Sequence, residues 1–392
     1  MIKVKMYPAC EGDAFLISFG EHQETNIIID MGLTETYRDF IRKDLIDLKE
    51  QGRRIDLLVI THVDQDHIQG AISFIEENGP EQKIIEVVEI WHNSYRHLQF
   101  EKEKTQITAN ELIALNQIKQ QNVFSDANGQ TDISIEQGST LASLLYANYP
   151  QWNTSFNNKA VCLENNFKNP LKNVEIKLLS PDKDKLNKLS KLWLNFLEDN
   201  IYEFNLSDDE IFDDAYELYI QSNEPVDFET SDASYSNKSF NIEDFNLTNG
   251  RDNSKTNGSS ISFILEYMGK KLLFLGDAHK DIIIRELTLL SEQGYELYFD
   301  LVKVSHHGSK NNISSELLQL ISSKRYLVST NGARHKHPDI EAIAEIAKAK
   351  HVKEIYTNYD HTKLTELNNE KLESQYNYKI IHCDNFLIAK GI

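Results

Sequence analysis

The chain has 392 residues, enough to bury a substantial core in one large domain or two ordinary ones. Its composition, 40% hydrophobic and 26% charged, is typical of a soluble globular protein, and no apolar stretch approaches the ~18 residues of a membrane span. The formal net charge of −20 excludes tight binding to nucleic acid by charge alone, because phosphates are neutralised by lysine and arginine. A nuclease of this composition would need metal ions and a local basic patch.

The start of the chain and its cysteines indicate the compartment. Residues 1–6 alternate like a strand and lack the apolar block of a signal peptide. The three cysteines, Cys10, Cys162 and Cys383, are odd in number and widely spaced, which is typical of a reducing environment. We therefore expect a cytoplasmic protein that is not attached to a membrane.

The first part of the chain alternates between the apolar periodicities of strands and helices. We expect strands near 2–7, 14–19, 26–30, 56–61 and 84–91, and helices over 34–51 and directly after residue 67. Helices over 109–122 and 138–147 and a strand over 174–181 follow.

Residues 182–256 differ from the rest in being acidic, polar and rich in serine, asparagine and aspartate. Aromatic residues persist in the first part, so we expect about 182–222 to be helical and partly packed, and about 223–256 to be a mobile loop. The segment is interpreted as an insertion that is either a surface elaboration without a role or a binding surface for a protein partner.

The last part of the chain returns to regular alternation. We expect a hairpin over 260–276, helices over 280–293, 313–322 and 339–350, strands over 298–304, 325–330 and 353–358, and a final pair of strands near 377–391. Repeated strand–helix alternation on a mixed sheet indicates an α/β (α+β) protein. We predict a single domain over 1–392 with the acidic insertion within it.

Residues 61–67 read THVDQDH and place four metal-capable side chains directly after the apolar run at 57–60. Such a run indicates a buried strand, so the cluster would lie on the loop at the carboxyl end of that strand, just before a helix. Imidazole and carboxylate groups at this density, with no cysteine nearby, suit zinc, manganese or iron. The sequence therefore predicts a metal site on this loop.

This pattern resembles the HxHxDH signature of the metallo-β-lactamase superfamily, with Asp64 where the second histidine usually stands. The HxDxDH form is similar to the hydrolase domain of the ComEC/Rec2 competence proteins and their soluble relatives. Further motifs occur in the same order: EGDA at 11–14, IIIDMG at 27–32, FLGDA at 274–278, VKVSHHGS at 302–309 and the segment from Asn331 to His337-Pro338. The resemblance implies an αββα sandwich of two mixed sheets flanked by helices.

The resemblance also implies a site with two divalent metal ions, zinc or manganese, with magnesium possible. His62 and Asp64 would bind one metal, Asp66 and His67 the other, and Asp277 would bridge them. The implied metal ligands are His62, Asp64, Asp66, His67, Asp277, His306 and His307. Of the last two, we favour His307 as the ligand and His306 as a contact to a phosphate or to a metal ligand, since neighbours on a strand point apart unless the chain has turned. Asp30 and Asn257 would support the ligands from behind.

Two departures from the superfamily pattern change the expected metal chemistry. Asp64 replaces an imidazole by a harder anionic donor, which tilts the preference towards manganese or magnesium. Residues 257–260 read NGSS, where the superfamily has a further histidine, so the first metal has fewer strong ligands.

His337 follows the strand expected at 325–330 and is interpreted as a hydrogen-bond donor or general acid above the metals. Together with Asp66 and His306 it makes up the expected catalytic residues. The alternative is that Pro338 begins the next helix and that His337 is solvated.

Three functions remain open on the sequence alone. The first is a phosphodiesterase or nuclease that acts on nucleic acid, because two metals suit phosphoryl transfer. The second is a hydrolase of another ester, a lactone or an amide, because the fold does not determine the substrate. The third is an effector subunit with little activity alone, whose acidic insertion contacts a partner protein.

Overall fold

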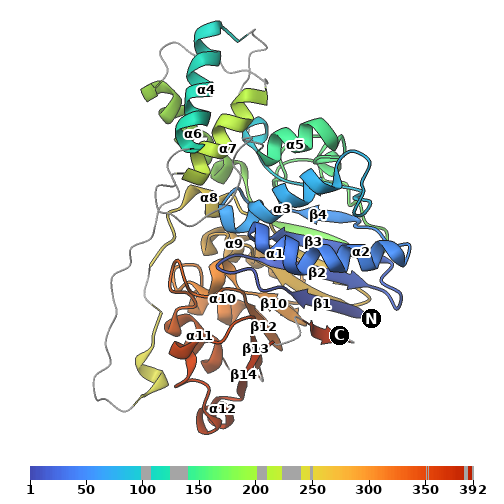
Figure 1. The fold of residues 1–392 in the computed structure, drawn as a ribbon. Helices are drawn as coiled ribbons and strands as arrows, with labels where there is room; N and C mark the ends of the chain where they lie inside the picture. Colours follow the sequence, from blue (N-terminus) through green and yellow to red (C-terminus); the bar gives the residue numbers. More distant parts are fainter. Residues whose placement is uncertain are drawn as a thin grey trace.

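The structure is a computed structural model, and it describes residues 1–98, 107–123, 140–200, 210–222, 240–247, 250–349, 351, 353–383 and 387–390. Two mixed sheets lie face to face, and helices cover both outer faces (Figure 1). The expected αββα sandwich is therefore confirmed. Among the described helices, none is both long and apolar enough to cross a membrane.

The first sheet has six strands in the order β15-β1-β2-β3-β4-β5. Their bounds are Leu387–Lys390 (β15), Ile2–Met6 (β1), Ala14–Phe19 (β2), Thr25–Met31 (β3), Leu57–Val59 (β4) and Ile90–Trp91 (β5). Strands β3, β4 and β5 are parallel, so their carboxyl ends meet at one edge. The outer face packs against Thr34–Thr36 (α1), Arg42–Glu50 (α2), Gln65–Asn78 (α3) and Leu141–Asn148 (α5).

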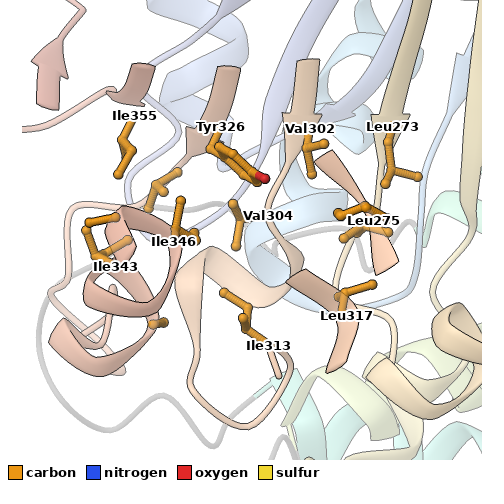
Figure 2. Close-up of a cluster of buried hydrophobic side chains, with 14 of the residues drawn as sticks. Leu273, Leu275, Val302, Val304, Ile313, Leu317, Tyr326, Ile343, Ile346 and Ile355 are labelled. Carbon is orange, nitrogen blue, oxygen red and sulfur yellow. The ribbon is translucent and has the colours of Figure 1, made fainter. Parts of the chain in front are cut away.

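The second sheet has seven strands in the order β14-β13-β12-β10-β8-β7-β6. Their bounds are Tyr378–His382 (β14), Lys353–Thr357 (β13), Arg325–Val328 (β12), Leu301–Lys303 (β10), Lys270–Phe274 (β8), Ser262–Tyr267 (β7) and Glu175–Ser180 (β6). Its outer face is covered by Lys280–Glu292 (α9), Ser315–Leu320 (α10), Ile340–Lys348 (α11) and Glu370–Tyr376 (α12). Figure 2 shows this layer, where Tyr326 and Ile355 of the sheet lie over Ile343 and Ile346 of α11.

A separate apolar layer fills the space between the two sheets. Phe15 of β2 meets Phe274 of β8 edge to face with ring centroids 5.6 Å apart, and Trp91 of β5 meets Phe263 of β7 at 6.3 Å. Because both faces of each sheet are covered, central strands such as β3 are buried at every residue and show no polar alternation. This continuous burial explains why the central strands were recognisable as apolar runs.

The structure differs from the expected strands in three places. The expected final pair is two strands of different sheets, since β14 ends the second sheet and β15 pairs with β1 at the edge of the first. Residues 298–304 divide into β10 and Tyr298–Phe299 (β9), which pairs with Ser322–Ser323 (β11) in a small separate sheet. Only Ile90–Trp91 of the strand expected at 84–91 forms β5, because the preceding residues make a single bridge between Val87 and Ile55. Local periodicity identified these segments as extended but did not reveal their partners.

A helical cap stands on the edge of the sandwich (Figure 1). It consists of Ala109–Val123 (α4), Lys183–Asn200 (α6) and Glu210–Ser222 (α7). The cap therefore combines a helix from before β6 with two helices of the expected insertion. Its core contains Trp193, Phe212 and Tyr216, and it also takes in Val63 of the metal loop.

The acidic residues of α7 face inwards. Asp213 is bonded to Arg96 through two side-chain contacts of 2.5 and 2.8 Å, and Glu217 lies 3.0 Å from His92 with both side chains fully buried. Asp214 accepts a hydrogen bond from Thr140 at 2.6 Å. These carboxylates bind side chains outside the cap and so hold α7 against the rest of the protein. Their negative charges are therefore buried and do not lie on the surface.

Residues 240–247 carry apolar side chains that are buried beside the second sheet. The expected mobile stretch 223–256 lies outside the described residues over 223–239 and 248–249. In the part that the structure describes, Ile242 and Phe245 are buried in the core beside the second sheet. Lys255–Gly258 (α8) follows and leads into β7. Residues 240–247 therefore contribute to the core of the second sheet.

Candidate metal centre

The metal loop begins where β4 ends and runs into the first turn of α3. His62 is buried, Asp64 is the residue before the helix, and Asp66 and His67 lie in its first turn. The loop backbone is in close contact with Gly12 in the turn between β1 and β2, where a Cβ atom would lie 1.7 Å from the carbonyl oxygen of Asp66. Only glycine fits at that position.

Asp30 holds the loop from behind, as expected. It ends β3 and accepts hydrogen bonds from the backbone N–H and the hydroxyl of Thr61, each at 2.8 Å. Its Oδ2 also lies 2.9 Å from Nδ1 of His67. This contact fixes the imidazole with Nε2 directed to the site, which is how carboxylates usually orient metal-binding histidines.

The second sheet contributes Asp277, His306 and His307 from the carboxyl ends of β8 and β10. His306 and His307 have φ angles of 45° and 55°, so the chain has turned before they occur. As a result their Nε2 atoms lie 3.9 and 3.3 Å from Oδ2 of Asp277. The structure thus brings both histidines to the site, whereas the sequence favoured His307 as the ligand.

These side chains converge as donors of one metal centre would. Oδ2 of Asp277 lies 3.6 Å from Nε2 of His67, and Nε2 of His307 lies 3.5 Å from Oδ2 of Asp66. Among the described residues, four sets of three donors each have their ligand atoms within 4.8 Å of one another. Two of these sets join the metal loop to the second sheet and share His67: His62, His67 and Asp277, and Asp66, His67 and His307. Donors that share an ion at ~2.0–2.2 Å are separated by similar distances.

Unpartnered polar atoms support the fit to a metal. Nε2 of His62, Nε2 of His67 and Oδ1 of Asp64 are buried and have no hydrogen-bond partner in the described chain. Buried polar groups are nearly always paired. The described chain supplies no partner for these three atoms, so a bound metal ion would satisfy them. Asp64 lies 3.4 Å from His62 and accepts a hydrogen bond from Thr256 at 3.1 Å, but belongs to none of these donor sets.

The charges of the site shift its pKa values strongly. Burial alone would lower the pKa of His67 and His307, but neighbouring carboxylates outweigh it and raise both pKa values well above the usual value. For His67 these are Asp66, Asp30 and Asp277, and for His307 they are Asp277 and Asp13. Burial would raise the pKa of Asp277, but His307 and His67 hold it well below its usual range. Before a metal binds, protonated His67 and His307 thus lie beside the ionised carboxylate of Asp277 at neutral pH.

Metal binding at neutral pH should therefore release protons. Each histidine must be neutral to bind a metal, and the raised pKa values mean that His67 and His307 are protonated when the metal arrives. Affinity should then increase with pH up to those values. Titration calorimetry in two buffers with different ionisation enthalpies measures the protons released. Identical heats in both buffers would contradict this expectation.

Asp252 is a site residue that the sequence did not reveal. Its Oδ2 lies 3.4 Å from Nδ1 of His306 and accepts hydrogen bonds from Asn257 at 2.8 Å and Asn312 at 2.9 Å. Burial would raise its pKa, but His306 holds it well below the usual range. Asp252 thus orients His306, and Asn257 lies against both groups, in keeping with its expected supporting role. Because Asp252 lies in a serine- and asparagine-rich run, no local signal distinguishes it.

Asp13 and Lys303 form a buried ion pair beneath the site. Both side chains are 1% exposed, and Nζ of Lys303 also lies 3.5 Å from Oδ1 of Asp277. Oδ1 of Asp13 lies 3.5 Å from Nδ1 of His307. Lys303 lies in an otherwise apolar strand, and a charged residue in such a run is the signal that could have identified it.

A cavity of about 410 Å³ opens over these residues. Asp64, Asp66, Asp277, His306 and His307 line its floor. Asn257, Arg251 and Lys255 line the same cavity, and the two cations are exposed. The cavity can therefore admit an anionic group above the donors.

Comparison with known proteins agrees with this geometry. Residues 7–143, which include β2 to β5 of the first sheet and the metal loop, match the family model described as the Metallo-beta-lactamase superfamily. This part of the chain is therefore similar to the metallo-β-lactamase superfamily. Among solved structures, the metallo-beta-lactamase fold protein YhfI from Bacillus subtilis is similar over 97% of this chain and 96% of that chain, at 9% identity and a TM-score of 0.36. No curated protein matches the chain.

His335 and His337 differ in their position relative to the cavity. His335 lines the cavity, and His337 does not. The ring of His337 lies 5.1 Å from that of His306, and its Nδ1 lies 3.4 Å from Asp339. Burial, with help from His306 and Arg334, lowers the pKa of His335 to about 4, so this side chain is neutral at neutral pH. His335 thus lines the cavity that contains the donors, and His337 lies beside His306.

Replacing Asp252 by asparagine should weaken metal binding about 10-fold to 100-fold, which is the usual cost of losing a group that orients a metal ligand. The amide keeps the volume but removes the negative charge opposite Nδ1 of His306. Competition with a chelating dye measures the effect. Asp244→Asn is the matched control, because Asp244 is exposed in the same segment and lies outside the cavity. Equal metal affinity in both variants would show that Asp252 does not orient His306.

Proposed function

We propose that the protein is a metal-dependent hydrolase, and specifically a phosphodiesterase that cleaves nucleic acid. The carrying observation is the composition of the cavity: carboxylates and imidazoles form its floor, and Arg251 and Lys255 lie among its lining residues. Carboxylate oxygens favour hard divalent ions such as Mn²⁺ and Mg²⁺. The two exposed cations suit a phosphate in a chain whose net charge of −20 otherwise repels it.

The side chains divide the work as follows. His62, Asp64, Asp66, His67, Asp277, His306 and His307 would hold two divalent ions, as the similarity to ComEC-type hydrolases implied. When bound, two such ions stabilise the attacking and leaving oxygens and lower the pKa of water. Arg251 and Lys255 would bind the non-bridging phosphate oxygens. His335, neutral at neutral pH, would donate a hydrogen bond to the leaving oxygen.

The test is hydrolysis by the purified protein with Mn²⁺, Mg²⁺ or Zn²⁺. We expect cleavage of DNA or RNA and release of p-nitrophenol from bis-p-nitrophenyl phosphate. Linear, circular and single-stranded substrates would show whether free ends are needed. Hydrolysis of p-nitrophenyl acetate or of a lactone, with phosphodiesters left intact under every metal, would instead favour the second class of substrate.

A subunit of a larger assembly is the second candidate, and the net charge favours it, since a basic partner could supply affinity for nucleic acid. Three acidic residues of the cap are buried and bind other parts of the protein: Asp213, Asp214 and Glu217. A basic partner would therefore bind other acidic residues on the surface of the cap. Glu198 and Asp199 at the end of α6 are exposed. Cleavage that needs a copurified partner would support this candidate.

A further inference from the structure

One wall of the cavity is apolar, in contrast to its floor. Leu192 of α6 and Tyr219 and Ile220 of α7 line the same cavity as Asp64, Asp66 and Asp277. Leu192 and Ile220 cannot bind a metal or hold a phosphate, and Tyr219 offers the flat face of its ring in addition to its hydroxyl. The wall is therefore available to contact a part of the substrate that does not react.

The ring of Tyr219 is held in place by other aromatic rings. It stacks on Phe196 of α6 with centroids 3.9 Å apart and an angle of 27° between the planes. Trp193 lies 5.5 Å from Tyr219 and 5.6 Å from Phe196, and its side chain is fully buried in the cap. The wall thus ends in a preformed aromatic cluster whose orientation does not depend on a ligand.

The wall is also fixed relative to the metal loop. Nε2 of Gln65, which lies between Asp64 and Asp66, donates a hydrogen bond of 3.4 Å to the carbonyl oxygen of Gln221 at the end of α7. Glu217, one turn earlier, is buried against His92 and accepts a hydrogen bond from the backbone N–H of Ala142 at 3.1 Å. Tyr219 and Ile220 lie between these two anchors, so their distance to the donors is set by the fold.

We infer that this wall, formed by Leu192, Tyr219 and Ile220, is a subsite for a flat aromatic group carried by the phosphoryl substrate. Arg251 and Lys255 would hold the phosphate over the donors, and the ring would lie against Tyr219. A nucleobase next to the scissile phosphate has this chemistry, because every base presents a flat π face to an aromatic side chain. The inference rests on the proposed function for the phosphate, but the preference for a ring can be measured without turnover.

The direct test is binding to the metal-loaded protein by titration calorimetry, with methyl phosphate, cyclohexyl phosphate and phenyl phosphate as probes. All three carry the same anionic group. Phenyl phosphate should bind about 10-fold to 100-fold more tightly than methyl phosphate, the range that stacking on one aromatic side chain usually gives. It should also bind more tightly than cyclohexyl phosphate, which has similar bulk but no flat face. Equal affinity for the phenyl and cyclohexyl esters, or for the phenyl and methyl esters, would overturn the inference.

Variants locate the preference at Tyr219. Tyr219→Leu should remove most of the preference for phenyl phosphate while leaving methyl phosphate binding unchanged, and Tyr219→Phe should retain it. Leucine keeps apolar volume in the cap, and a thermal unfolding curve checks that the cap stays folded. Tyr298→Leu is the matched control, since Tyr298 is 42% exposed on β9 and lies outside the cavity. A preference that survives Tyr219→Leu would overturn the assignment.

The two proposals fail separately. A clear preference for phenyl phosphate without cleavage of any phosphodiester would contradict the proposed function but support the subsite. Cleavage of phosphodiesters without such a preference would leave the proposed function standing and overturn the subsite.

Discussion

Replacing Asp66 and His67 together by alanine should reduce hydrolysis by at least ~10³-fold while the protein stays folded. Loss of residues that hold a catalytic metal ion and position the reacting water usually lowers turnover by this much. His67 belongs to both donor sets that join the metal loop to the second sheet, and Asp66 reaches His307 through Oδ2, so the double change disables both halves of the site. Steady-state turnover of bis-p-nitrophenyl phosphate and metal content by elemental analysis measure the result.

Glu21→Ala with His22→Ala is the matched control, because this acid–histidine pair is exposed in the turn between β2 and β3. It should keep full turnover. Circular dichroism and thermal unfolding distinguish a disabled site from a disrupted fold. Substantial turnover in the Asp66/His67 variant would place the chemistry elsewhere in the chain.

Replacing Lys303 by methionine should destabilise the metal-free protein by about 3–5 kcal/mol, the usual effect of removing one partner from a buried ion pair. Asp13 would then remain buried without its cation, and Asp277 would lose a second positive neighbour. Burial alone would lower the pKa of Lys303, but Asp13 and Asp277 outweigh it and raise the pKa. The stabilisation is therefore present at neutral pH and is lost only as the pH rises through that raised value.

Urea unfolding of the metal-free variants measures this effect. Asp13→Asn with Lys303→Met should be less destabilising than the sum of the two single changes, because the double variant buries neither unpaired charge. Strictly additive effects would show that the pair contributes little beyond its separate contacts. Lys270→Met provides a control, since Lys270 pairs with Asp300 at 3.0 Å but its side chain is 45% exposed.

Much of the fold and most of the floor of the site could be predicted from the sequence. His62, Asp66 and His67 are close in the chain, and their spacing was sufficient to identify the loop. Asp277 and the two histidines end apolar strands, where the site of a sandwich of this kind lies. Strand ends and dense donor runs are local patterns, and local patterns can be recognised without knowing the packing.

The walls of the site could not be predicted, because they depend on contacts between distant segments. Asp252 acquires its role only when residues 250–256 pack against His306. His335 and His337 are two residues apart in a loop, and periodicity does not indicate which one faces the cavity. The side chain of Glu217 points into the protein because it binds the buried His92, which is 125 residues away in the chain.

The location of the donors on both sheets has a further consequence. His62, Asp66 and His67 lie on the loop that follows β4 of the first sheet, whereas Asp277, His306 and His307 come from the second. An ion shared by these donors would cross-link the two sheets. Because only the folded protein brings the donors together, binding of the ion would stabilise the folded state against separation of the sheets. Neither half of the chain expressed alone would hold a complete set, so chelation should loosen the sandwich along the plane between its sheets.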